Sequence, residues 1–585
     1  MSTARWILRA AVALALSLPA YAAAQQDPGA TGPYAVTMTE YGSNTTSISL
    51  GEIQTIEVLA QVHYPTNLNN GPYPLVILLH GRHSTCYLSD GSGVLAWPCV
   101  GSTPVPSYKG YDYLASLLAS HGMIVASISA NGINAVDNNT TTYGMDERAA
   151  LIQHHLGKWR TFSTGGGGAP FGSTFVGRVD LTRVGTMGHS RGGEGVIWNY
   201  ERNLSLGSPF GIRAVLPLAP VDFFGHYAND VPVGVMLPYC DGDVFELPGV
   251  AFFDDARYNT TTDQAAKYTF LSLGANHNYF NRYWTPDQFA FATSDDWSFR
   301  DGAQSDPWCG TSAAGNGRLT SAKQRGFGAA YMAAFFRRHL LAATQFDGIL
   351  RGQAAPPPSA QTTAVYSGYF PGVSDRKDLN RLSISSEVST NTLGGSVTSS
   401  GLVANALCGD WTGLNCVSGR EPHRSSLSSL EVGWNSLSAR YSNQLPLLKR
   451  DVSNFDHIQF RVSVDYSSTR NPVGQAQNLS VQLVDGAGRT ASVKVSDYSG
   501  LLFYPPGGGI IGGVDYNWRI AAVMNTLRIP LTAFPAIDKT SVVSVDLLFN
   551  QKSSGQVLLS DFAFTDEGTT VAEEWSVPNA ILTLL

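Results

Sequence analysis

The sequence predicts a two-part fold: an α/β unit with a mostly parallel sheet and helices on both faces, then an all-β sandwich of jelly-roll type. Before residue 352, short apolar runs alternate with helical patterns, which is typical of strands buried on both faces. After residue 365, helical periodicity gives way to period-two alternation and hairpin turns. The length of 585 residues also exceeds one ordinary domain of roughly 100–200 residues.

The composition excludes two functional classes. The chain has 38 Lys and Arg against 45 Asp and Glu, a net charge of −7, and no basic run, so it does not fit a nucleic-acid-binding protein. Aromatic residues make up 11% of the chain, enough to build packed cores, which excludes a disordered protein. Charged residues make up only 14%, which is typical of β-rich extracellular proteins.

Residues 1–24 have the features of a secretory signal peptide. Arg5 and Arg9 precede an apolar stretch, and a run of small residues ends at Ala24. That stretch is half as long as the ~20 residues that span a membrane, and no later segment is long and apolar enough. We expect cleavage near Ala24 and a secreted or periplasmic protein with no transmembrane segment.

Six cysteines in an exported chain should be paired. Among the connectivities that they allow, we favour pairing between nearest neighbours, which gives Cys86–Cys99, Cys240–Cys309 and Cys408–Cys416. No Cys-x-x-Cys motif with partnering histidines is present in the sequence, so no metal site is predicted.

The first unit is expected to span residues 25–351. Its strands and helices follow from apolar runs and helical spacing. Strands are expected at residues 34–41 and 53–64, as an antiparallel edge, and at 75–79, 123–128, 183–187, 214–218, 233–237 and 268–273. Helices are expected at residues 111–121, 145–159, 194–200 and 321–341.

Residues 352–365 are expected to form a linker, because three consecutive prolines, Pro356 to Pro358, make a semi-rigid spacer. Few contacts should cross such a spacer, so a chain ending before Ala355 is expected to fold alone. The sandwich would occupy residues 366–575, with a hairpin turn at Asp485-Gly486-Ala487-Gly488. Its strands are expected at 458–464, 479–484, 491–495, 526–530, 542–549 and 557–564.

The motif Gly188-His189-Ser190-Arg191-Gly192 follows the strand at 183–187 and opens a helix. A strand, a tight turn permitted by glycines and a helix form a nucleophile elbow, which exposes a serine hydroxyl. Ser190 is therefore the predicted nucleophile. An oxyanion hole needs two backbone N–H groups, and we expect those of Arg191 and Arg82, with Gly81 giving flexibility.

The general base should follow the last strand of the parallel sheet. His277 lies just past the strand at 268–273 and is the predicted base. Asp243 follows the preceding strand and is the predicted acid, with Asp241 and Asp222 as alternatives. The order Ser190, Asp243, His277 is that of hydrolases with a nucleophile elbow.

With these motifs, residues 30–345 resemble the α/β-hydrolase superfamily of esterases and lipases. The Gly-His-Ser-Arg-Gly-Gly elbow is similar to that of chlorophyllases and dienelactone-hydrolase-like proteins. The resemblance implies cleavage of a carboxylic ester through an acyl-enzyme, with no cofactor. The sandwich resembles jelly-roll modules of secreted carbohydrate-active enzymes, which implies a carbohydrate ligand for it.

Aromatic residues are dense after His277, and we expect Tyr279 and Trp284, with His83, to line a substrate pocket. Glu194 is expected to form an ion pair with Arg191 or Arg148. The ester could be small or polymeric. The alternative function is an inert or peptidase-like protein of this fold whose sandwich binds a glycan or a cell surface.

Overall fold

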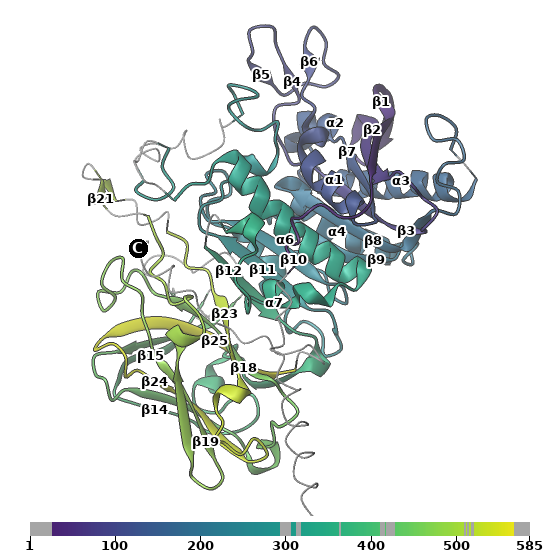
Figure 1. Ribbon diagram of the computed structural model, residues 1–585. Coiled ribbons are helices and arrows are strands. Elements are labelled where there is room, and N and C mark those ends of the chain that lie inside the picture. The colour runs from purple at the N-terminus through teal and green to yellow at the C-terminus, as the bar shows by residue number, and fades with distance from the viewer. Residues whose placement is uncertain are drawn as a thin grey trace, which may run out of the picture.

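The computed structural model describes residues 26–165, 167–292, 306–311, 317–361, 364–409, 416, 427–507, 510–511, 514–515 and 520–566. The predicted signal peptide, residues 1–24, lies outside them. The described residues form an α/β unit and a β unit, which lies below it in the view of Figure 1.

A nine-stranded sheet forms the centre of the α/β unit. Its pairings are parallel from β7 through β3, β8, β9 and β10 to β11, whereas β1, β2 and β12 form antiparallel edges. The pairing of β1 with β2 confirms the predicted antiparallel edge. In sheet order the strands are β1 (Val36–Leu50), β2 (Ile53–Pro65), β7 (Ile124–Ile128), β3 (Tyr73–Leu79), β8 (Val179–His189), β9 (Ile212–Leu218), β10 (Val233–Pro238), β11 (Lys267–Ser272) and β12 (Val365–Phe370).

The sheet is buried on both faces, because alternate side chains of a strand point to opposite sides. In β3, Leu75, Ile77 and Leu79 belong to one hydrophobic core. Val76 and Leu78 belong to the other core. A strand that faces a hydrophobic core on each side needs apolar residues at every position, and β3 has them.

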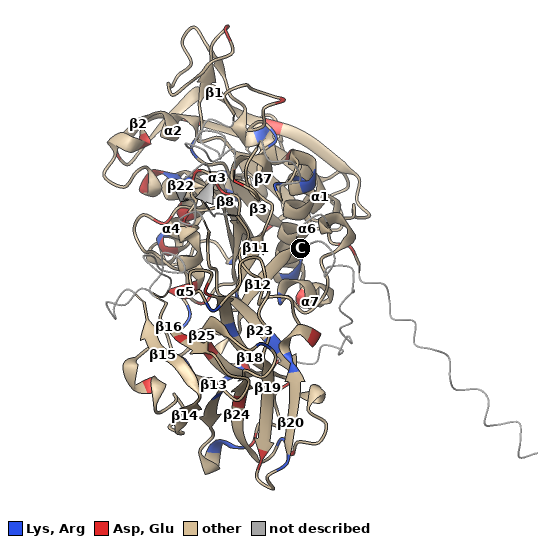
Figure 2. Cartoon of the chain, turned by 90° about the vertical axis from the view of Figure 1, so that its left-hand side faces the viewer, with Lys and Arg blue, Asp and Glu red and all other residues tan. Residues whose placement is uncertain are grey.

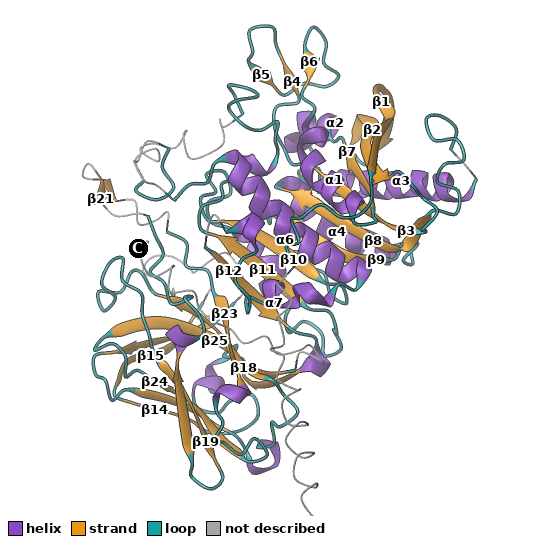
Figure 3. Ribbon diagram, in the orientation of Figure 1, coloured by secondary structure: helices purple, strands orange, loops and turns teal. Residues whose placement is uncertain are grey.

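Helices cover both faces of the sheet (Figure 3). α3 and α4 supply the first core, and α1 and α6 supply the second. The helix predicted at residues 321–341 has the same bounds as α6, whereas α3 and α4 continue past their predicted ends, α3 through the buried Phe162 and α4 through the buried Asn203. The helices are α1 (Asp112–Ser120), α2 (Asn131–Val136), α3 (Met145–Thr164), α4 (Arg191–Ser205), α5 (Ala251–Asp254), α6 (Ser321–Leu341) and α7 (Asp347–Leu350).

The β unit consists of two antiparallel sheets that share one hydrophobic core. The hairpin predicted around Asp485 is confirmed by the antiparallel pairing of β19 with β20. The jelly-roll type stays a prediction. One sheet holds β13 (Arg376–Asn380), β15 (Leu402–Cys408), β16 (Ser429–Trp434), β25 (Gly555–Thr565), β18 (His457–Val464) and β23 (Asn525–Pro530). The other holds β14 (Val397–Ser400), β17 (Arg440–Gln444), β24 (Val542–Leu548), β19 (Ser480–Asp485) and β20 (Thr490–Lys494).

Small sheets lie outside these layers. β4 pairs with both β5 and β6 in the segment after β3, and β21 pairs with β22 near the end of the β unit. These strands are β4 (Cys86–Tyr87), β5 (Gly93–Val94), β6 (Thr103–Pro104), β21 (Ile510–Ile511) and β22 (Val514–Asp515).

The boundary between the units differs from the prediction. Residues 366–370 were expected in the sandwich, but β12 pairs antiparallel with β11 and completes the nine-stranded sheet. The proline-rich stretch also packs on the α/β unit: the Ser359 hydroxyl donates to Asp27 Oδ1 at 2.6 Å, and Ala360 is buried. The described residues of this stretch, 352–361 and 364–365, therefore pack on the α/β unit and precede β12 of the same sheet.

Buried ion pairs join the two units. Arg461 Nη1 of β18 lies 2.5 Å from Asp254 Oδ1 of α5, and both side chains are almost fully buried. Arg257, just after α5, pairs with Asp561 of β25. In the view of Figure 2, α5 lies on the side of the α/β unit that faces the β unit. The β unit is therefore held by contacts that a flexible tether would lack.

All three predicted disulfides are present: Cys86–Cys99, Cys240–Cys309 and Cys408–Cys416. Such bonds form and persist in oxidising compartments. Within the described ranges, no helix has the length and apolar character needed to cross a bilayer.

Candidate active site

Ser190 stands in a strained turn between β8 and α4. Its backbone has φ 57° and ψ −123°, in the left-handed region that favours glycine. The Ser190 N–H donates to the carbonyl of Leu218 at 2.9 Å, and the Ser190 carbonyl accepts from the N–H of Gly193 at 2.8 Å. Such strain persists only where neighbouring structure imposes it, and it is the geometry of a nucleophile elbow.

Two glycines allow this turn to pack closely. A Cβ atom at Gly188 would lie 1.8 Å from the carbonyl oxygen of Gly192, so no other residue fits there. A Cβ atom at Gly81 would lie 2.5 Å from the Cβ of Ser190. The segment after β3 therefore touches the predicted nucleophile directly, as an oxyanion loop must.

The two predicted oxyanion donors flank Ser190. Arg191 is the first residue of α4, so its N–H has no partner within the helix. Arg82 follows Gly81, and no described residue accepts a hydrogen bond from the Arg82 N–H. Both N–H groups are thus available to a ligand at Ser190.

His277 is oriented by a buried carboxylate. β10 and β11 are parallel neighbours, so the loops after Pro238 and Ser272 meet at one edge of the sheet. There His277 Nδ1 lies 2.7 Å from Asp241 Oδ2, and both side chains are 1% exposed. Asp241 Oδ1 accepts hydrogen bonds from the N–H groups of Asp243 at 3.0 Å and Val244 at 2.6 Å, which fixes the carboxylate.

The prediction that Asp243 orients the imidazole through Nδ1 is wrong. Asp243 Oδ2 lies 3.6 Å from His277 Nε2, on the other side of the ring, and its side chain is 40% exposed. The turn that Asp241 closes points the Asp241 carboxylate inward and carries Asp243 toward solvent. The third carboxylate considered, Asp222, accepts from the N–H of Gly225 instead.

His189, directly before the predicted nucleophile, holds the loop of the predicted base. Burial lowers the pKa of His189 well below its ordinary value, so the ring is neutral. Its Nδ1 lies 2.9 Å from the hydroxyl of Tyr111, and its Nε2 lies 3.0 Å from the carbonyl oxygen of His277. The Tyr111 hydroxyl therefore donates to Nδ1, and Nε2–H donates to His277. No local sequence signal points to Tyr111, because it lies far from His189 along the chain.

The predicted pocket residues His83 and Trp284 are buried packing residues. Trp284 is 0% exposed, its ring stacks on His83 at 4.8 Å, and its Nε1 donates to the hydroxyl of Ser107 at 3.0 Å. The proposed nucleophile Ser190 is itself only 3% exposed, so a role of His83 and Trp284 in a substrate pocket stays a prediction. Tyr279 is partly exposed, with the Arg318 guanidinium 5.2 Å from its ring centroid, and its role stays a prediction.

Glu194 does not form the expected ion pair. Its carboxylate oxygens accept from the backbone N–H groups of Phe223 at 3.0 Å and Phe224 at 3.2 Å. Burial raises the pKa of Glu194 to about 8, although these hydrogen bonds oppose the shift. Arg191 and Arg148 pair with Asp137 instead, a residue that no sequence motif marks.

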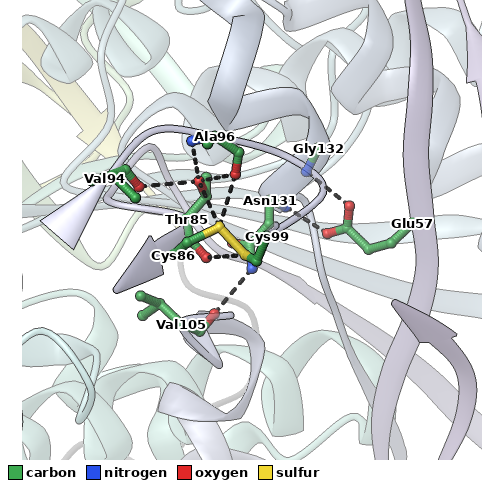
Figure 4. The surroundings of a disulfide bond; sticks show 9 residues. All are labelled: Glu57, Thr85, Cys86, Val94, Ala96, Cys99, Val105, Asn131 and Gly132. Atoms are coloured by element: carbon green, nitrogen blue, oxygen red, sulfur yellow. Dashed lines mark hydrogen bonds between the residues drawn. A yellow bond between two sulfur atoms is a disulfide. The ribbon is translucent and has the colours of Figure 1, made fainter. Parts of the chain in front are cut away.

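Two disulfides brace loops near the site. Cys240–Cys309 joins the residue before Asp241 to the segment at 306–311, as predicted. Figure 4 shows the other, Cys86–Cys99, close to the start of α2. There Glu57 accepts from the backbone N–H groups of Asn131 and Gly132, which fixes where α2 begins.

No family model matches the chain. Over 196 residues it is 25% identical to a cutinase of Thermobifida fusca, a match that covers 30% of this chain and 54% of that protein. It is 26% identical over 218 residues to cutinase est1 of Thermobifida alba, covering 33% of this chain and 65% of that protein. A further cutinase of Thermobifida fusca is 24% identical over 254 residues, covering 40% of this chain and 76% of that protein.

The chain thus spans about half the length of the first of these relatives. The similarity is distant and confined to a third or so of the chain. It supports the α/β-hydrolase superfamily, to which cutinases belong, and an esterase-like enzyme. It supports neither the narrower chlorophyllase-like elbow nor the jelly-roll module.

Proposed function

We propose that this protein is an exported serine hydrolase that cleaves carboxylic esters. The observation that carries the proposal is the buried contact of 2.7 Å between His277 Nδ1 and Asp241 Oδ2. Ser190 stands in a strained elbow, and its neighbour His189 contacts the carbonyl oxygen of His277 at 3.0 Å. These contacts support a Ser-His-Asp triad that performs acyl transfer. The distant similarity to cutinases supports the same chemistry.

In the proposed mechanism, Asp241 accepts a hydrogen bond from Nδ1–H of His277 and so leaves Nε2 unprotonated. Nε2 takes the hydroxyl proton of Ser190 while Oγ bonds to the ester carbonyl carbon. The N–H groups of Arg82 and Arg191 would hold the resulting oxyanion. The tetrahedral intermediate expels the alcohol, which takes the proton from His277. Water then loses a proton to His277 and attacks the carbonyl carbon of the acyl-enzyme. The bond to Ser190 Oγ breaks, His277 returns the proton to Oγ, and the carboxylic acid leaves.

The substrate range is proposed from the relatives. The three relatives described above are named cutinases. Both polymeric esters and small esters should therefore be tested as substrates. Carbohydrate binding by the β unit stays a prediction from the resemblance. The three disulfides support secretion into an oxidising compartment.

Labelling with a fluorophosphonate probe tests the nucleophile. We expect the probe to modify Ser190 in the full chain and to leave Ser190→Ala unlabelled, with the labelled peptide identified by mass spectrometry. Turnover of p-nitrophenyl butyrate should fall by about 10³ or more in Ser190→Ala. Ser205→Ala, an exposed position at the other end of α4, is the matched control and should keep both activities. A folded Ser190→Ala variant that still cleaves the ester contradicts the mechanism, and an unlabelled wild type supports an inert protein.

A further inference from the structure

Three arginines converge on one buried carboxylate beside the elbow. Asp137, fully buried after α2, lies 2.9 Å from Arg82 Nε, 2.8 Å from Arg148 Nη2 and 3.0 Å from Arg191 Nη1. Arg82 and Arg191 are the residues whose N–H groups flank Ser190. The arginine cluster is defined here as Arg82, Arg148 and Arg191.

The arginine cluster carries more positive charge than Asp137 neutralises. Three guanidinium groups stay charged at neutral pH, whereas Asp137 supplies one negative charge. Glu194 does not compensate, because it binds backbone N–H groups and burial raises its pKa to about 8. Burial lowers the pKa of Arg191; the charge of Asp137 opposes this lowering, and the charges of Arg148 and Arg82 add to it.

Part of the surplus charge is accessible to solvent. Arg148 is 0% exposed and also donates to Asn134, whereas the side chains of Arg82 and Arg191 are 27% and 15% exposed. Arg82 uses only Nε on Asp137, and no described residue takes its Nη groups. A guanidinium with free Nη donors is suited to a planar carboxylate.

Two aromatic side chains lie next to the guanidinium group of Arg191. The Arg191 guanidinium lies 5.5 Å from the ring centroid of Phe223 and 5.9 Å from that of Tyr143, and both rings are largely exposed. An apolar surface next to a cation suits a ligand with a hydrocarbon part and an anionic end.

We propose that the preferred esters carry a free carboxylate, as half-esters of dicarboxylic acids do, and that Arg82 and Arg191 bind it. The inference rests on the proposed ester hydrolysis at Ser190. Gly81 touches Ser190, and Arg82 and Arg191 are the chain neighbours of these two residues, so the arginine cluster belongs to the two segments that meet at the proposed nucleophile.

Matched substrates test the proposal on the full-length protein. The monomethyl esters of succinic, adipic and sebacic acid have a free carboxylate, and the corresponding dimethyl esters do not. For at least one chain length we expect kcat/KM of methanol release to be about tenfold higher for the half-ester than for the dimethyl ester. This is the size of effect that one charged hydrogen bond produces. The preference should shrink as salt is raised from about 0.02 to 0.5 M, because salt screens partly exposed charges.

Paired variants of α4 locate the effect. Arg191→Met should lower the ratio of half-ester to dimethyl-ester kcat/KM about tenfold. Arg202→Met removes an exposed arginine from the same helix, one paired with Asp146, and should leave the ratio unchanged. A dimethyl ester preferred at every chain length, or a ratio equally altered by both variants, overturns the proposal.

A binding measurement separates this proposal from the proposed function. On Ser190→Ala protein, calorimetry should detect monomethyl adipate and not dimethyl adipate, with loss of binding at high salt. If esters are not cleaved but this binding occurs, the proposed function fails and the anion site stands. If esters are cleaved without a charge preference and half-ester binding is absent, the anion site fails alone.

Discussion

The hydroxyl of Tyr239 in the α/β unit donates a hydrogen bond of 2.7 Å to the carbonyl of Pro506 in the β unit. Tyr239 stands two residues before Asp241, so the β unit contacts the loop that orients the proposed base. Phe503 of the same β-unit segment stacks on Tyr366 of β12 at 4.3 Å. The β unit therefore supports the loop that holds Asp241 and the edge strand β12, a role that the predicted tethered module would not have.

Truncation is expected to show this dependence. A chain ending after residue 353 lacks β12, which leaves the edge of β11 unpaired. It also lacks Arg461 and Pro506, the partners of Asp254 and Tyr239 in the β unit. We expect it to aggregate or to unfold at a much lower temperature, with little ester turnover. Soluble expression, thermal unfolding and p-nitrophenyl butyrate turnover measure this. A stable, fully active truncated chain would mean that the interface has no role in the fold.

Substitutions of the two loop carboxylates should have very different effects. Asp241→Asn keeps the shape of the side chain but can place an amide N–H against His277 Nδ1, which favours the wrong tautomer. We expect kcat to fall by up to about 10⁴. Asp243→Asn, at the exposed neighbour, is the matched control and should change kcat less than about tenfold. Equal losses in both variants would contradict the assignment of Asp241.

The sequence alone predicts the nucleophile Ser190 and the base His277, because each residue stands just after the end of a predicted strand. A nucleophile elbow needs a glycine-flanked serine after a buried strand, and the base must follow the last parallel strand. The helix at 321–341 is also predicted at its observed bounds, since its apolar face is long. These signals are local, so one sequence is enough.

Asp241 and the boundary at β12 depend on distant contacts. Asp241 and Asp243 follow the same strand two residues apart, and only the folded turn shows which carboxylate faces His277. β12 follows a run of prolines, and its pairing partner β11 lies almost a hundred residues earlier in the chain. Composition alone cannot assign such a strand to a sheet.

Removal of Arg461 is expected to destabilise the protein strongly. Its guanidinium pairs with Asp254 across the two units and donates to the carbonyl of Met524. Arg461→Met leaves the Asp254 carboxylate buried without this partner, which should cost about 3–5 kcal/mol of unfolding free energy. Urea denaturation measures it. Arg202→Met removes an exposed ion pair and should cost about 0–1 kcal/mol. Similar costs for both variants would contradict a buried ion pair at the interface.

Glu194 should make the protein less stable at alkaline pH. Burial raises its pKa from the ordinary 4.5 to about 8, so the folded chain keeps this proton while the unfolded chain releases it. The stability that Glu194 contributes is complete below pH 4.5 and is lost as the pH rises through about 8. Glu194→Gln cannot ionise, so its melting temperature minus that of the wild type should increase between pH 5 and about pH 8 and level off above that. Differential scanning fluorimetry at closely spaced pH values measures this difference. Parallel curves for the two proteins would show that Glu194 titrates at its ordinary pKa in the folded state.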